Sequence, residues 1–127
     1  MSAKKAKPNL LLTERALHDI AEIERYSIEQ FGRKSAHKYI SDIEAALSRL
    51  QENPTLLRAE EDLHPGLCFY RVSKHLLVCD VQPTTIFLLT VIHASRDIPS
   101  RLAEMQPNLR LEVEVLREKT ANRGRKR

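Results

Sequence analysis

The residues whose types best suit chemistry come directly after an apolar run, IFLLTVI at positions 86–92. They are His93, Ser95, Arg96 and Asp97. The imidazole of His93 can act as a general acid or base near neutral pH. With Arg71 and Arg96 supplying positive charge for a phosphorane-like transition state, it forms a candidate ribonuclease site. The structural alternatives are a hydrogen-bonded histidine at a strand end and an exposed Arg96–Asp97 ion pair worth under ~1 kcal/mol.

Three short apolar runs are predicted to form strands, and these strands should position the polar residues. We predict a hairpin of residues 67–72 and 75–81, with Cys68 directly opposite Cys79. One face of this hairpin is almost wholly apolar and should lie against helices. The other face is expected to be partly open to a partner, and it carries Phe69, Arg71 and Val78. The third run is apolar on both faces, which is typical of a central strand.

Two amphipathic helices precede these strands. The apolar run 10–12 after Pro8 predicts a short edge strand, and Thr13 is predicted to cap the first helix. That helix should end at Gly32, and its apolar face is Leu17, Ile20, Ala21, Ile28 and Phe31. The second helix should start at the cap residue Ser35 and end before Pro54, and its apolar face is Ala36, Tyr39, Ile40, Ile43, Leu47 and Leu50. The short connection indicates an antiparallel helical hairpin.

The two ends of the chain carry its basic character. Residues 1–7 hold three lysines, and residues 116–127 hold six Lys or Arg against Glu118, so the body between them is net acidic although the whole chain is +4. We predict a basic disordered leader over 1–7, a domain over 8–102 and an extension with a basic tail over 103–127. Within the extension, residues 100–105 suggest a helical turn, and the alternation over 109–116 suggests a further strand or an interaction segment.

Several classes of protein are excluded by composition. Two cysteines without C-x-x-C spacing fit neither a disulfide framework nor a zinc site, and we expect no metal and no cofactor. No run approaches the ~18 apolar residues of a membrane span, and the start lacks a sustained signal-peptide segment. The expectation is a soluble cytoplasmic protein that does not associate with membranes.

The order of the predicted elements resembles the ParE/RelE superfamily, the toxins of type II toxin–antitoxin pairs. The resemblance runs from about Leu12 to Leu102 and rests on four stretches. They are LTERALHDIAEIERY, FGRKSAHKYISDIEAALSRLQENP, LHPGLCFYRV with the following HLLVCDV, and VIHASRDIP. It implies an α+β fold in which an N-terminal edge strand and an antiparallel two-helix hairpin pack on an antiparallel sheet, in the order β-α-α-β-β-β.

The resemblance also implies a toxin that arrests growth until a cognate antitoxin covers it in a heteromeric complex. ParE-like members bind DNA gyrase, and RelE-like members cut messenger RNA on the ribosome. The acidic body, the few cations and the absence of Tyr or Phe after Pro99 favour the ParE-like branch. A ribosome-dependent ribonuclease using Arg71, His93 and Arg96 stays the alternative. A non-toxic binding member is the third reading, because Cys79 stands where the family often has a tyrosine.

The predicted surface for the target or the antitoxin combines basic and apolar side chains. It consists of Arg58, Phe69, Arg71, Val78, His93, Arg96 and Asp97. Cations set in an apolar patch are a common composition for a protein-binding surface. The sequence therefore favours recognition over catalysis at this end of the chain.

Overall fold

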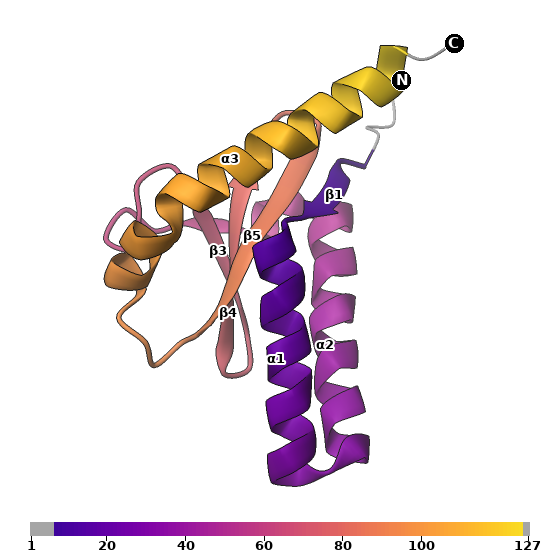
Figure 1. The fold of residues 1–127 in the computed structure, drawn as a ribbon, viewed down its shortest axis with the longest axis vertical. Helices are drawn as coiled ribbons and strands as arrows, with labels where there is room; N and C mark the ends of the chain where they lie inside the picture. The colour runs from indigo at the N-terminus through magenta and orange to yellow at the C-terminus, as the bar shows by residue number, and fades with distance from the viewer. Residues whose placement is uncertain (1–6, 126–127) are drawn as a thin grey trace.

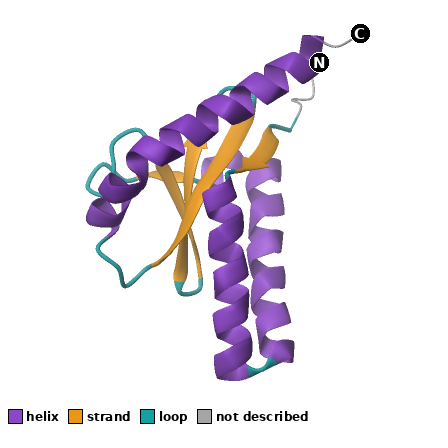
Figure 2. Cartoon of the chain, in the orientation of Figure 1, coloured by secondary structure: helices purple, strands orange, loops and turns teal. Residues whose placement is uncertain are grey.

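A five-stranded sheet lies between a helical hairpin and a long C-terminal helix in the computed structural model (Figures 1 and 2). The structure describes residues 7–125, and of residues 120–125 only the backbone. The elements are β1 (Asn9–Leu12), α1 (Glu14–Phe31), α2 (Arg33–Glu52), the 3₁₀ turn η1 (Pro54–Leu56), β2 (Arg58–Ala59), β3 (Cys68–Val72), β4 (His75–Val81), β5 (Thr85–His93) and α3 (Ile98–Arg125). The predicted α+β class is confirmed, and the strand β2, the turn η1 and the helix α3 are additions to the predicted order of elements.

The strand order is β1-β5-β4-β3-β2, so β5 is an interior strand between β1 and β4, and β1 is an edge strand, as predicted. The predicted hairpin register is also confirmed, because Cys68 pairs with Cys79 and Val72 with His75. Strands β2 to β5 are antiparallel, but β1 runs parallel to β5. The sheet is therefore mixed, because the chain crosses over through the helical hairpin before it returns beside β1.

A β-bulge in β5 changes how this strand meets β4. Val78 pairs with Thr90 while its neighbour Cys79 pairs with Leu88, which leaves Leu89 as the extra residue. Beyond the bulge the register places His75 directly opposite His93. The bulge therefore decides which side chains meet at the end of the sheet.

The helical hairpin covers one face of the sheet. Thr13 caps α1 as predicted, since its Oγ1 accepts a hydrogen bond from the Ala16 N–H at 3.0 Å. Gly32, at φ 91°, ends α1 and is also the N-cap of α2, so the prediction of Ser35 as that cap is wrong. The hairpin buries an apolar cluster with the sheet, including Ala16, Ile43, Leu47, Leu50, Leu77, Cys79, Ile86 and Leu88.

The predicted apolar face of α1 needs correction. Leu17 and Phe31 are exposed, while the buried face includes Ala16 and Ser27 with the half-buried Ile20 and Ile23 between them. The packing of α1 against β5 and α2 rotates the buried face away from the largest side chains. An apolar strip on α1 is consequently left in solvent.

Helix α3 overturns one further prediction, because residues 109–116 are helical rather than a strand. The helix runs from Ile98 to Arg125 and so crosses residue 102. Its buried residues, Ile98, Leu102, Met105, Leu109 and Val113, recur at helical spacing and form a second core with the sheet. Phe69 and Val78 are only 3% and 0% exposed beneath it, so the predicted open face is wrong for these two residues.

A carboxylate from α3 holds this helix against α1. Glu112 Oε1 accepts hydrogen bonds from the backbone N–H groups of Glu14 at 2.7 Å and Arg15 at 3.3 Å. These are donors of the first turn of α1 that have no partner within the helix, and the helix dipole favours an anion there. The contact links the C-terminal segment to the start of the hairpin.

The predicted leader lies almost wholly outside the described residues, since only Lys7 of residues 1–7 is described. Its ammonium group lies 2.6 Å from the Glu52 carboxylate at the end of α2. None of the helices in the described part of the chain is both long and apolar enough to cross a membrane.

Candidate functional site

One end of the sheet brings together two histidines and a tyrosine from three elements. His75 begins β4 and His93 ends β5, and their rings stand edge to face with centroids 5.1 Å apart. Tyr39 reaches them from α2, with its hydroxyl 2.6 Å from His75 Nδ1. The same hydroxyl lies 3.2 Å from the Val72 carbonyl and accepts the Lys74 N–H at 3.3 Å. The phenol therefore fastens α2 to the β3–β4 turn.

His93 is held by the turn that follows β5. Its Nδ1 accepts the backbone N–H of Ser95 at 3.1 Å, with the Ser95 hydroxyl 2.8 Å away. A ring nitrogen that accepts an N–H carries no proton, so in the neutral ring the proton sits on Nε2. The Ala94 N–H donates to the Lys74 carbonyl at 2.8 Å, which ties this turn to the β3–β4 turn. The orientation of His93 is thus set by its neighbours.

Burial changes the pKa of two members of this cluster, His75 and Tyr39. Burial, reinforced by the neighbouring charges of His93 and Lys74, lowers the pKa of His75 to about 4, although Asp19 acts in the opposite direction. Burial also raises the pKa of the Tyr39 hydroxyl. At neutral pH His75 is an uncharged hydrogen-bonding group and not a proton donor for catalysis.

Three cations lie at the same end of the sheet as this cluster. Arg71 is exposed on β3, and its Nε donates to the Ser73 carbonyl at 2.7 Å. Lys74 lies in the turn and Arg96 follows β5, both exposed. Among the residues that the structure describes, none of the three forms an ion pair. The predicted trio of Arg71, His93 and Arg96 therefore lies at one end of the sheet, but the register places Arg71 on the face opposite that of His75 and His93.

The other predicted binding residues do not join this end. Arg58 is exposed on the edge strand β2, opposite Phe69. Asp97 accepts the Ser100 hydroxyl at 2.9 Å and its N–H at 3.4 Å, so it caps the start of α3. Phe69 and Val78 are core residues. His75 and Tyr39 were missed as site residues, because the bulge that aligns His75 with His93 has no signature in the sequence.

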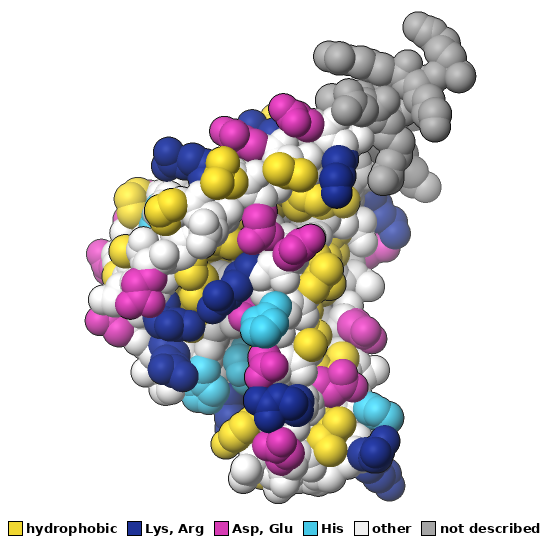
Figure 3. Space-filling view, in the orientation of Figure 1, with side chains coloured by type: hydrophobic (Ala, Val, Ile, Leu, Met, Phe, Trp, Pro, Cys, Tyr) yellow, Lys and Arg dark blue, Asp and Glu magenta, His cyan; other side chains and the backbone are white. Residues whose placement is uncertain are grey.

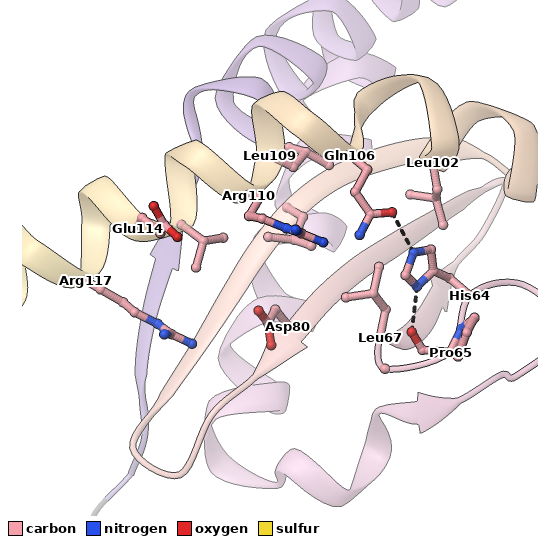
Figure 4. Close-up of a pocket in the computed structure, with 13 residues that line it drawn as sticks. His64, Pro65, Leu67, Asp80, Leu102, Gln106, Leu109, Arg110, Glu114 and Arg117 are labelled. Atoms are coloured by element: carbon pink, nitrogen blue, oxygen red, sulfur yellow. Dashed lines mark hydrogen bonds between the residues drawn. The ribbon is translucent and has the colours of Figure 1, made fainter.

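A hollow of about 290 Å³ lies beneath α3, at some remove from the cluster (Figure 4). Arg110 and Arg117 line it from α3 and Asp80 lines it from β4, and His64 contacts Gln106 at 2.8 Å. Charges of both signs line it, so its composition selects no class of ligand. Over residues 7–125, no three His, Cys, Asp or Glu side chains gather to hold a metal ion.

Comparison with solved structures identifies the fold of the chain. The chromosomal ParDE toxin–antitoxin system from P. aeruginosa is similar with a TM-score of 0.61 and 19% identity, covering 68% of this chain and 96% of that one. The RelBE2 toxin–antitoxin complex from Mycobacterium tuberculosis is similar with a TM-score of 0.53 and 16% identity, covering 75% and 100%. At these identities the likeness establishes the fold, which is RelE/ParE-like.

Comparison of the sequence with known proteins identifies the family of the chain. The family model described as the ParE toxin of type II toxin–antitoxin systems, parDE, matches residues 10–98. The curated Toxin ParE from Escherichia coli is 25% identical over 95 residues, which cover 74% of this chain and 92% of that protein. The chain belongs to the ParE toxin family, and the predicted resemblance is confirmed. The family match ends at the residue where α3 begins, so this helix lies beyond it.

Proposed function

We propose that this protein arrests growth by binding DNA gyrase and that a cognate antitoxin neutralises it. The observation that carries the proposal is the ParE family match across residues 10–98, from β1 to the start of α3. The arrangement of the sheet end supports it, because a neutral His75, at the same end as three cations that form no ion pair within residues 7–125, is suited to binding rather than to acid–base catalysis.

A supercoiling assay tests the proposal directly. Purified protein is added to gyrase, relaxed plasmid and ATP, and the products are treated with detergent and protease. We expect loss of supercoiling together with linear plasmid, the product of a trapped cleavage complex. The double variant Arg71→Ala/Arg96→Ala should lose this inhibition, and Arg25→Ala, whose guanidinium is exposed on α1, should keep it. Unchanged supercoiling at micromolar toxin would contradict the gyrase target.

The surface for the antitoxin has to be placed anew, because α3 covers Phe69 and Val78. Both structural relatives are toxin–antitoxin systems, which supports a heteromeric complex for this chain as well. We place the antitoxin on α1, where Leu17 and Phe31, on the same side of the helix, are 55% and 63% exposed. Exposed apolar strips of this kind accept the apolar face of an amphipathic segment.

Co-purification from cells that express both genes measures this contact. Leu17→Ser/Phe31→Ser should weaken the complex by about tenfold or more, because large apolar side chains carry much of the binding free energy at such interfaces. Leu111→Ser, on the exposed side of α3, is the control and should leave the complex intact. If Leu111→Ser abolished the complex while Leu17→Ser/Phe31→Ser left it intact, the antitoxin would bind α3 instead of α1.

A ribosome-dependent ribonuclease is the second candidate, favoured by the assembly of Arg71, His93 and Arg96 with a second imidazole. Primer extension on messenger RNA from a translation extract would reveal codon-positioned cuts under this reading. The absence of cuts, together with gyrase inhibition, would exclude it. Induced expression without growth arrest would instead favour a non-toxic binding member of the family.

A further inference from the structure

The two basic segments of the chain, residues 1–7 and 116–127, join the folded body at the same end of the molecule. Strand β1 begins directly after the first segment, and α3 runs into the second. Leu11 of β1 and Leu116 of α3 pack against the same apolar cluster. Figure 1 shows the C-terminal half of α3 passing beside β1, at the end opposite the tip of the helical hairpin. Two segments far apart in the sequence therefore form one basic pole.

The charge of the basic pole has one dominant sign. Its residues include nine Lys or Arg against Glu118 alone, which is +8, while the rest of the chain is net −4. The pole stays positive when the acids that adjoin it are counted. With Glu52, which pairs with Lys7 at 2.6 Å, and with Glu112 and Glu114 on α3, it keeps +5. On the face drawn in Figure 3, by contrast, acidic and basic side chains are interspersed along the helical hairpin.

Helix α3 carries the second segment beyond the sheet. Of the described side chains, Val113 is the last that α3 buries, and Arg117 and Lys119 are exposed. These two residues are two positions apart, so they lie on opposite sides of the helix. Neither forms an ion pair in the part of the chain that the structure describes. A helix with cations on both sides suits the major groove of duplex DNA, which admits a helix between two rows of phosphates.

The composition of the basic pole favours phosphate over a protein partner. The only apolar side chain in residues 117–127 is that of Ala121, and residues 1–7 add Met1 and two alanines. Protein interfaces draw most of their affinity from a few large side chains, aromatic ones above all, in well-packed pockets, and the pole supplies no aromatic residue. A phosphodiester backbone needs only cations and hydrogen-bond donors, which make up most of these two segments.

We propose that the basic pole binds the phosphate backbone of duplex DNA, with the C-terminal turns of α3 in a groove and residues 1–7 on the same duplex. The net negative charge of the rest of the chain repels a polyanion, so the helical hairpin points away from the DNA. Such binding is electrostatic and independent of base sequence. It does not rest on gyrase being the target, and it involves none of Arg71, His93 and Arg96, which lie at the other end of the sheet.

Fluorescence anisotropy of the full-length protein tests the proposal, with a short labelled duplex titrated over a range of salt. Arg117→Gln/Lys119→Gln should weaken binding roughly tenfold at low salt and make the slope of log K against log salt shallower by about two, because two phosphates are no longer neutralised. The matched control is Arg33→Gln/Lys34→Gln, which removes the same two charges from exposed positions at the tip of the helical hairpin and should leave the slope unchanged.

Several outcomes would overturn the proposal. Equal effects of the two double variants would show that affinity follows net charge alone. Unchanged binding by Lys4→Gln/Lys5→Gln would show that the two segments do not share one duplex. A labelled polyglutamate peptide that binds as tightly as the duplex, with the same sensitivity to the variants, would indicate an acidic protein partner. Tighter binding of single-stranded RNA than of duplex DNA would exclude a helix held in a groove.

A second readout uses the natural chain. Lysine acetylation followed by mass spectrometry measures how far each ammonium group is covered when duplex DNA is bound. Saturating duplex should slow the acetylation of Lys119 and leave that of Lys34 unchanged. Equal acetylation of Lys119 with and without the duplex would place the DNA elsewhere on the molecule.

Discussion

Asp19 joins α1 to the central strand, and its removal offers the sharpest test of this fold. Strand β1 ends opposite Leu88, so the edge of β5 beyond that point has no strand beside it. The Asp19 carboxylate replaces the missing strand: it accepts the Thr90 hydroxyl and the Val91 N–H, the latter at 3.1 Å. Thr90 is completely buried next to the bulge. Both donors lose their partner in the variant Asp19→Ala.

The cost follows from those two donors. A buried donor left without an acceptor costs about 1–3 kcal/mol, so with two such donors Asp19→Ala should reduce the free energy of unfolding by about 2–6 kcal/mol. At roughly 4 °C per kcal/mol for a domain of this size, Tm should fall by about 8–24 °C. Urea unfolding followed by circular dichroism measures the loss, and the m-value should stay unchanged because the same surface is exposed on unfolding.

Two comparisons separate this effect from a loss of surface charge. Asp42→Ala removes a carboxylate that pairs with Lys38 on the exposed side of α2, and it should cost under about 0.5 kcal/mol. In the Asp19→Ala background, Thr90→Val should cost less than it does in the natural chain, because the hydroxyl has already lost its acceptor. A loss below about 0.5 kcal/mol for Asp19→Ala would refute the assignment of the carboxylate as the partner of β5.

Three further predictions concern α3, the histidine pair and the tail. Glu112→Ala removes the acceptor of the Glu14 and Arg15 N–H groups. We expect the free energy of unfolding to fall by about 1 kcal/mol and trypsin to cleave α3 faster. Unchanged cleavage would show that Glu112 does not hold α3 against α1. Because the pKa of His75 falls from 6.5 to about 4 on folding, the unfolded chain binds more protons between these pH values, so stability should decline from pH 6.5 to pH 4. The His75→Gln variant should show less of this decline in pH-dependent urea unfolding. Deletion of 117–127 should weaken binding to nucleic acid or acidic partners, and undiminished binding would show that the tail plays no part.

Local pattern was enough to predict the β3–β4 hairpin. Its turn is short, one of its faces is almost wholly apolar, and a slip by one residue would have placed Arg71 in the core. The Thr13 cap and the Gly32 stop were predicted for the same kind of reason, because each depends on the chemistry of a single residue at a helix end. These local features were enough to predict the fold class and most of the order of its elements.

The failures share a different cause. Residues 109–116 alternate like a strand, yet the apolar positions Leu102, Leu109 and Val113 also suit one helix face, and only the uncovered face of the sheet selects between the two patterns. Once α3 occupies that face, Phe69 and Val78 become core residues rather than a binding surface. Sequence periodicity alone does not reveal which apolar face will be covered by a segment far along the chain.

The sequence by itself determined a ParE-like α+β protein, with a cluster of His93, Arg96 and Arg71 at the end of an apolar sheet. Only the tertiary structure determined which other side chains lie beside His93. The extra residue Leu89 shifts the register so that His75 faces His93, and α2 brings Tyr39 onto the pair. Bulges and contacts between distant helices depend on packing free energy summed over the whole domain, which no short stretch of sequence contains.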